Sequence, residues 1–192
     1  LIGPQGIDSN NGRAQYQAAQ ERYRLTGDTL EVPLTTQTES GLNVTKTFVI
    51  KRGHYDIGVN YAIENQSSEA AQLQFYGQLQ QTMTAGESGS MIMPTYFGAA
   101  YSQDEDKFEK YPFDDMREKK LSVTTQTGWV SMLQHYFVAA WVPTQTQQNK
   151  FYSQVTPSNQ AVIGVLYPST TVQPGASKTI DATIFVGPKD QD

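Results

Sequence analysis

The sequence predicts an all-β protein, a large antiparallel sandwich with little helix, and three observations support this prediction. Apolar and polar residues alternate strictly along residues 55–64, which is the period of a strand with one buried face. Apolar runs of strand length recur along the chain and are separated by turns rich in Gly, Pro, Asn and Ser. Almost no stretch shows the apolar repeat of an amphipathic helix. Sheet packed on sheet is therefore the expected core.

The first elements follow from this pattern. Residues 1–12 are rich in Gly, Asn and Pro and are expected to be extended and flexible. Residues 14–23 have a helix-forming composition without an apolar stripe, so their state stays open. Residues 42–50 and 55–63 are expected to form an antiparallel pair. A third strand is expected over residues 73–79, with Gly77 at one inward position.

The second half repeats the strand pattern after a long excursion. Residues 102–120 are rich in charge and are expected to be exposed. The remaining strands are expected at residues 121–125, 129–133, 137–142, 151–155, 161–167 and 179–186. The sequence shows no internal repeat and no second domain boundary, so residues 1–192 are expected to form one domain.

Composition excludes several classes of function. The net charge is −5, and no run of Lys or Arg exceeds a pair, which argues against nucleic-acid binding and gives little support to binding of anionic lipid. The absence of cysteine excludes disulfides, thiolate nucleophiles and cysteine-based zinc sites. The longest apolar run, residues 136–142, is far shorter than the roughly 20 residues of a membrane-spanning helix. The chain begins at Leu1 without a methionine and is expected to be a soluble fragment of a longer protein.

Two clusters are candidate ligand sites. Residues 128–143 hold both tryptophans, Trp129 and Trp141, and no formal charge. Their rings could line a ligand cleft, but apolar neighbours favour core packing, in two strands joined by a turn at residues 134–136. The acidic residues of the excursion could offer oxygen ligands to Ca²⁺, but they lack the spacing of a calcium loop, and a solvated loop is expected. They are Asp104, Glu105, Asp106, Asp114 and Asp115.

Several separated motifs together resemble one family. They comprise Thr-Lys-Thr-Phe-Val-Ile-Lys-Arg-Gly at residues 45–53, the tryptophan segment, and three shorter stretches at residues 98–102, 109–115 and 185–188. In this order and spacing, from about Asn43 to Pro188, they resemble the periplasmic domain of the YidC membrane protein insertase of Gram-negative bacteria. The resemblance implies a β-supersandwich like that of galactose mutarotase, located in the periplasm as part of an inner-membrane protein. The chain lacks the transmembrane helices and groove arginine of the insertase proper.

The resemblance also implies a function without catalysis. The domain would be an interaction module of an insertase and chaperone, with contacts to the Sec translocon, to its accessory complex SecDF through SecF, and to nascent membrane proteins. Mutarotase chemistry would need a histidine acid and a carboxylate base. Neither His54 nor His135 has the sequence context for that role, so no catalytic residue, metal or cofactor is expected. The alternative is a carbohydrate-binding or carbohydrate-active domain that uses the sandwich cleft.

A second aromatic concentration supplies the candidate partner surface, which combines residues 72–82 with residues 96–113. Aromatic rings interleaved with charged side chains are suited to a protein interface. The role expected by default, however, is that these rings anchor a long loop onto the sandwich. The candidate contact residues are Phe75, Tyr76, Gln78, Gln80, Tyr96, Phe97, Tyr101, Tyr111 and Phe113.

Overall fold

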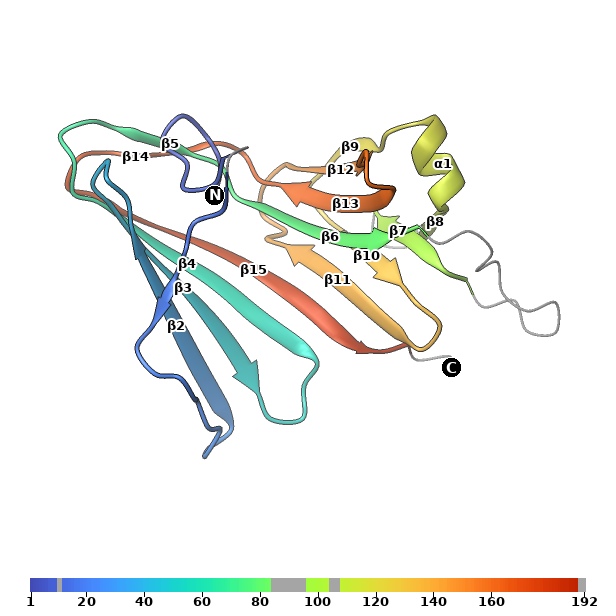
Figure 1. The fold of residues 1–192 in the computed structure, drawn as a ribbon, viewed down its shortest axis with the longest axis horizontal. Coiled ribbons are helices and arrows are strands. Elements are labelled where there is room, and N and C mark those ends of the chain that lie inside the picture. The colour runs from blue at the N-terminus through green and yellow to red at the C-terminus, as the bar shows by residue number, and fades with distance from the viewer. Residues whose placement is uncertain (10–11, 84–95, 104–107, 190–192) are drawn as a thin grey trace. The chain divides into compact units, whose positions relative to one another are not determined.

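The computed structural model describes residues 1–9, 12–83, 96–103 and 108–189 (Figure 1). Antiparallel strands dominate it, and the predicted all-β sandwich class is confirmed. The chain divides into two compact units, each assembled from separate stretches. The first contains Leu1–Tyr76 and Pro168–Thr183, and the second contains Gly77–Tyr167 and Ile184–Asp192.

The first unit contains a series of strands that the alternation pattern predicts well. Its strands follow the order β1 (Gln17–Ala18), β2 (Thr29–Gln37), β3 (Leu42–Lys51), β4 (Asp56–Asn65) and the first part of β15 (Ser177–Pro188). The predicted pair is β3 with β4, in antiparallel register with Phe48 opposite Val59. The residues left open at 14–23 contain only the short β1.

The core of the first unit lies on the alternating face of β4. Val59, Tyr61 and Ile63 are buried, and the Tyr61 ring meets Phe75 edge to face at a centroid distance of 5.7 Å. Burial raises the pKa of Tyr61 to about 12. Beside it, the Lys46 ammonium lies 5.6 Å from the Tyr61 ring centroid and 4.8 Å from that of Phe48. Burial lowers the pKa of Lys46.

The predicted third strand is wrong as a single element. It divides into β5 (Ala71–Leu73), which pairs with β14 (Thr170–Val172), and β6 (Tyr76–Thr82), which belongs to another sheet. The physical reason lies at Gln74, whose backbone exchanges hydrogen bonds of 2.9 and 2.7 Å with Ile2. The hydrogen-bonded ladder of this segment therefore changes its partner strand at Gln74. The same bonds hold the first residues of the chain, which composition predicts to be flexible.

In its described residues, the second unit contains a four-stranded sheet and five further strand segments. The sheet has the order β6, β13 (Gln160–Leu166), β12 (Asn149–Val155) and β9 (Ser122–Thr125). The other strands follow the order β15, β11 (Phe137–Pro143), β10 (Trp129–Leu133), β7 (Gly98–Ser102) and β8 (Glu109–Tyr111).

The charge-rich excursion is more ordered than its composition predicts. It contains β8 and a short helix, α1 (Phe113–Glu118), in place of a continuous exposed loop. Met116 is the buried residue of α1 and is 2% exposed, so this helix is held by one apolar side chain. Residues 104–106 of the acidic cluster lie outside the described part of the chain.

The tryptophan segment forms β10 and β11, as predicted. The turn between them is closed by a 2.8 Å bond from the Gln134 N–H to the Phe137 carbonyl. Core packing is confirmed for Val130 and Leu133, which are buried, but both tryptophan rings are only partly buried. The Trp141 ring lies against Gly77 of β6, where a Cβ atom would come within 2.8 Å of it.

Candidate partner-binding surface

The aromatic residues at 96–103 and 108–113 are tied to one another within the second unit. Phe97 and Phe113 meet edge to face, with ring centroids 5.7 Å apart. Tyr101 and Tyr111 form a second such pair at 6.2 Å. These contacts are the kind that fix a loop onto a sheet.

The tyrosine hydroxyls of this segment also have partners inside the unit. The Tyr101 hydroxyl donates to Glu109 Oε2 at 2.6 Å, and the Tyr96 and Tyr111 hydroxyls donate to the carbonyls of Ala99 and Lys119. Burial and the nearby Glu109 carboxylate raise the pKa of Tyr101 to about 12. These contacts support the anchoring role for most of the aromatic side chains.

One exposed aromatic contact in this region was missed among the candidate residues. Phe108 is 51% exposed, and its ring lies 5.9 Å from that of Trp129 on β10. Next to it, Lys110 is exposed and places its ammonium 5.0 Å from the Tyr96 ring centroid. The interleaving of aromatic and charged residues places both of them in the predicted range 96–113, but neither is among the candidate contact residues. Exposed aromatic rings are enriched at partner-binding surfaces, so Phe108 is the stronger candidate of the two.

Among the candidate contact residues in the segment 72–82, some lie in the core and others lie at the surface. Phe75 is 2% exposed, so its ring packs inside the first unit. The Tyr76 hydroxyl donates to Asp8 at 3.3 Å, and Gln78 accepts a 3.3 Å bond from the Tyr152 hydroxyl. Gln80 is exposed and bonds Gln160 on the neighbouring strand β13. Gln78 and Gln80 lie on β6, which is an edge strand of its sheet.

Asn159 connects the end of β6 to the helix α1. Its side-chain amide donates to the Met83 carbonyl at 2.7 Å, directly after β6, and its Oδ1 accepts from Arg117 of α1 at 3.3 Å. The residue has a positive φ of 58° in the β12–β13 turn, which asparagine tolerates well. The Pro-Ser-Asn sequence predicts that turn, but nothing local predicts the two remote contacts.

The histidines show no catalytic arrangement. His54 Nδ1 lies 3.2 Å from Asp56 Oδ1 in an exposed turn of the first unit, and His135 is exposed and stacks edge-on against Tyr136. In the described ranges there is no group of three His, Asp or Glu residues placed to hold a metal ion. No helix among the residues with described positions is long and apolar enough to span a membrane.

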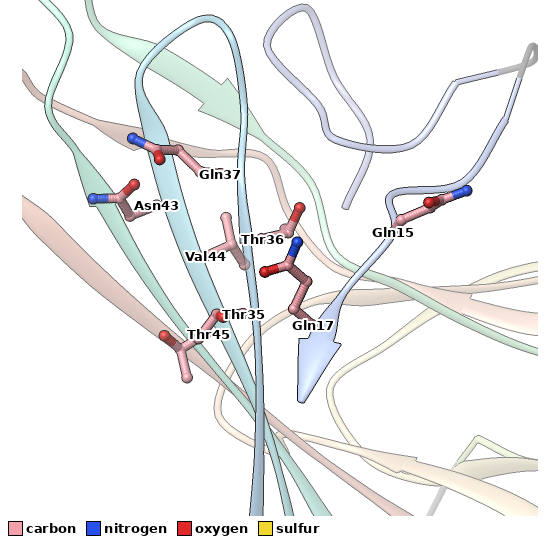
Figure 2. A pocket seen from close by; sticks show the side chains of 8 residues that line it. All are labelled: Gln15, Gln17, Thr35, Thr36, Gln37, Asn43, Val44 and Thr45. Atoms are coloured by element: carbon pink, nitrogen blue, oxygen red, sulfur yellow. The ribbon is translucent and has the colours of Figure 1, made fainter. Parts of the chain in front are cut away.

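A polar groove of about 510 Å³ lies in the first unit (Figure 2). It was not predicted from the sequence. Its lining is free of charge and aromatic rings and is dominated by amide and hydroxyl groups, which can both donate and accept hydrogen bonds. Figure 2 shows the side chains arranged around the paired ends of β2 and β3 and the nearby β1. The lining residues are Gln15, Gln17, Thr35, Thr36, Gln37, Asn43, Val44 and Thr45.

Comparison with protein families gives a match over the whole chain. The model of the YidC periplasmic domain matches residues 1–192. The chain belongs to the YidC periplasmic domain family. The resemblance carried by the sequence motifs is thereby confirmed, and with it the periplasmic location.

Two YidC relatives show how much of a longer protein this chain represents. The chain is 52% identical to the membrane protein insertase YidC of Shewanella amazonensis and 45% identical to that of Pseudoalteromonas atlantica. The alignments cover 100% of this chain but only 36% and 35% of those proteins. The chain therefore spans about a third of the relatives that it matches.

A solved structure confirms the sandwich variety expected of the YidC family. A galactose mutarotase-like protein from Lactobacillus casei superposes with a TM-score of 0.58, covering 93% of this chain and 76% of that one. Sequence identity is 8%, so the likeness concerns the fold alone.

Proposed function

We propose that this chain is a non-enzymatic interaction module that serves a membrane protein insertase from the periplasm. The observation that carries the proposal is the family match over residues 1–192. Because the chain spans about a third of its relatives, insertion itself would belong to the whole protein. This domain would assist the insertion and folding of inner-membrane proteins by supplying contacts in the periplasm.

The partners that we propose are the Sec translocon, its accessory complex SecDF through SecF, and nascent membrane proteins. The exposed part of the candidate surface supports such contacts. Phe108 and Lys110 offer an apolar ring and a cation, and Gln80 offers an amide on an edge strand. Anchored aromatics such as Tyr101 would hold this surface in shape, which lowers the entropic cost of binding.

A module without catalysis also agrees with the chemistry of the described residues. The His54–Asp56 pair is solvent-exposed, with side chains 59% and 43% exposed, and neither residue lines the polar groove. General acid–base catalysis needs groups held within hydrogen-bond reach of a bound substrate. No described histidine meets that condition in the groove.

Co-purification with SecF tests the proposal in the full-length protein. We expect Phe108→Ala and Lys110→Glu to weaken co-purification, because they remove the exposed ring and reverse the exposed charge. Lys178→Glu makes the same charge change at an exposed position of β15, outside the candidate surface, and serves as the matched control. If both test variants retain SecF as the control does, this surface is not the SecF-binding site.

Carbohydrate binding is a second candidate because of the polar groove. Amide and hydroxyl groups are suited to sugar hydroxyls, although the lining offers no aromatic ring for stacking. Titration of the domain with a broad glycan panel, followed by NMR, tests it. Saturable shifts that disappear in Gln17→Ala and Asn43→Ala would establish this function, and an unresponsive domain would exclude it.

A further inference from the structure

The hairpin between β10 and β11 ends in exposed aromatic side chains. Tyr136 is 68% exposed and Phe137 is 58% exposed, the highest values among the large hydrophobic residues that the structure describes. The His135 ring packs edge-on against Tyr136 at a centroid distance of 4.6 Å. We call His135, Tyr136 and Phe137 the hairpin tip. Val186, 48% exposed, lies on the neighbouring strand β15.

The turn itself does not require aromatic residues. It is closed by the backbone bond from Gln134 to Phe137, which any side chain would permit. Leaving two large rings in water gains nothing for folding. A cluster of exposed apolar residues on a soluble domain usually marks a site of contact with a protein or a membrane.

The chemistry of the hairpin tip favours a lipid surface. Residues 128–143 contain no formally charged side chain, and the charged residue bonded to the tip is Lys189, whereas protein interfaces normally surround their apolar centre with a polar rim. Tyrosine with a neighbouring apolar ring is typical of the membrane–water boundary, where the ring is in an apolar layer and the hydroxyl stays hydrated. This mode of contact depends on aromatic rings and does not require a run of Lys or Arg, of which the sequence has none longer than a pair.

The last described residue lies beside the same tip. The Lys189 N–H donates to the Tyr136 carbonyl at 2.8 Å. The relatives are membrane protein insertases, and about two thirds of their length lies outside the region that this chain matches. Under the proposed function, a bilayer is therefore within reach of the domain.

We propose that the hairpin tip inserts Tyr136 and Phe137 into the headgroup region of the bilayer and anchors the domain there. The proposal rests on the domain being part of a membrane protein insertase. It concerns a different surface from the SecF contact, which is centred on Phe108 and Lys110.

A site-specific fluorescent label tests the contact in the full-length protein, reconstituted in phosphatidylethanolamine and phosphatidylglycerol vesicles. The chain contains no cysteine, so Gln134→Cys gives one labelling site beside the tip once any cysteine elsewhere in the protein is replaced. His54→Cys is the matched control, because His54 and the 54%-exposed Tyr55 form another exposed His-Tyr pair in a hairpin turn.

We expect brominated lipid to quench the label at position 134 and aqueous iodide to quench it poorly, with the reverse pattern at position 54. Tyr136→Ser with Phe137→Ser should restore iodide access at position 134. Equal iodide access at both positions, or equal lipid quenching at both, would overturn the proposal. Protection from iodide without lipid quenching would also overturn it, because a protein would then cover the tip. Co-purification with SecF is a separate measurement and reports on the proposed function alone.

Discussion

At the scale of single residues, Gly77 shows how one missing side chain positions a strand. The Trp141 ring occupies the space in which a Cβ of residue 77 would stand. Gly77 is buried, and the Trp141 ring lies directly against it. The contact therefore places β6 and its candidate partner-binding residues against an aromatic surface.

Gly77→Ala should lower the free energy of unfolding by about 1 to 3 kcal/mol, because the added methyl group overpacks against Trp141. Gly27→Ala is the control, since open space surrounds that glycine, and it should change stability by less than about 0.5 kcal/mol. Urea unfolding of the two variants measures the difference. Equal stabilities would show that the ring moves aside without cost.

Tyr61 should make the stability of the chain fall between pH 10 and pH 12. Its pKa in the folded protein is raised to about 12 by burial, whereas the unfolded chain releases the same proton near pH 10. The folded state therefore binds more protons in this window, and stability decreases as pH rises. We expect Tyr61 to contribute a loss on the order of 2 kcal/mol, measured by urea unfolding at each pH. The decrease should be smaller in Tyr61→Phe, which keeps the contribution of Tyr101. Identical slopes for both proteins would contradict this assignment.

Single residues also show where sequence reasoning reaches its limit. The strict alternation along β4 correctly predicts that Val59, Tyr61 and Ile63 share a buried face, because a strand has a period of two. The contact of Gly77 with Trp141 joins positions far apart in the chain, and no local pattern reveals it. The two remote bonds of Asn159 are unpredictable for the same reason.

At the scale of elements, hairpins are predicted better than short or interrupted segments. The β3–β4 and β10–β11 pairs follow from local alternation and turn residues. The helix α1 spans only Phe113–Glu118 and buries one residue, too few positions to produce an apolar stripe. The division between β5 and β6 depends on Ile2, which competes for the Gln74 backbone from another part of the sequence.

The β12–β13 turn should hold the end of β6 and α1 through Asn159. Asn159→Ala loses both side-chain bonds and keeps an unfavourable positive φ, so we expect a loss of about 1 to 3 kcal/mol. Asn159→Gly loses the same bonds but relieves the backbone, so its stability should lie between those of Asn159→Ala and the unsubstituted protein. Hydrogen exchange at the Met83 amide, which donates to the Asn159 carbonyl at 3.0 Å, reports on the turn directly. Unaltered exchange in Asn159→Ala would show that the side chain does not hold this junction.

At the scale of the whole molecule, each compact unit is completed by a segment that returns from later in the chain. Pro168–Thr183 completes the first unit and Ile184–Asp192 extends the second. Asn65 illustrates the dependence, because its side chain donates to the Val172 carbonyl at 2.9 Å and its carbonyl accepts from the Gly175 N–H. Sequence patterns alone do not bring such distant segments together, whereas the polar groove is lined entirely within residues 15–45.

The single domain predicted for residues 1–192 should unfold in one cooperative transition. β15 contributes Ser177–Thr183 to the first unit and Ile184–Pro188 to the second without interruption, so fraying of this strand would affect both. We expect coincident urea transitions by circular dichroism and by amide NMR signals from each unit. A fragment of residues 1–76 alone, which lacks the β14 and β15 segments, should stay unfolded. Two separated transitions would show that the units are independent domains.

The two tryptophans give this domain a pair of native spectroscopic reporters. Trp129 contacts the exposed Phe108 ring, whereas Trp141 covers Gly77 on β6. The emission of Trp129 would therefore register an event at the aromatic segment, and that of Trp141 a movement of β6. Single-tryptophan variants can thus follow each half of the candidate surface during binding without any attached dye.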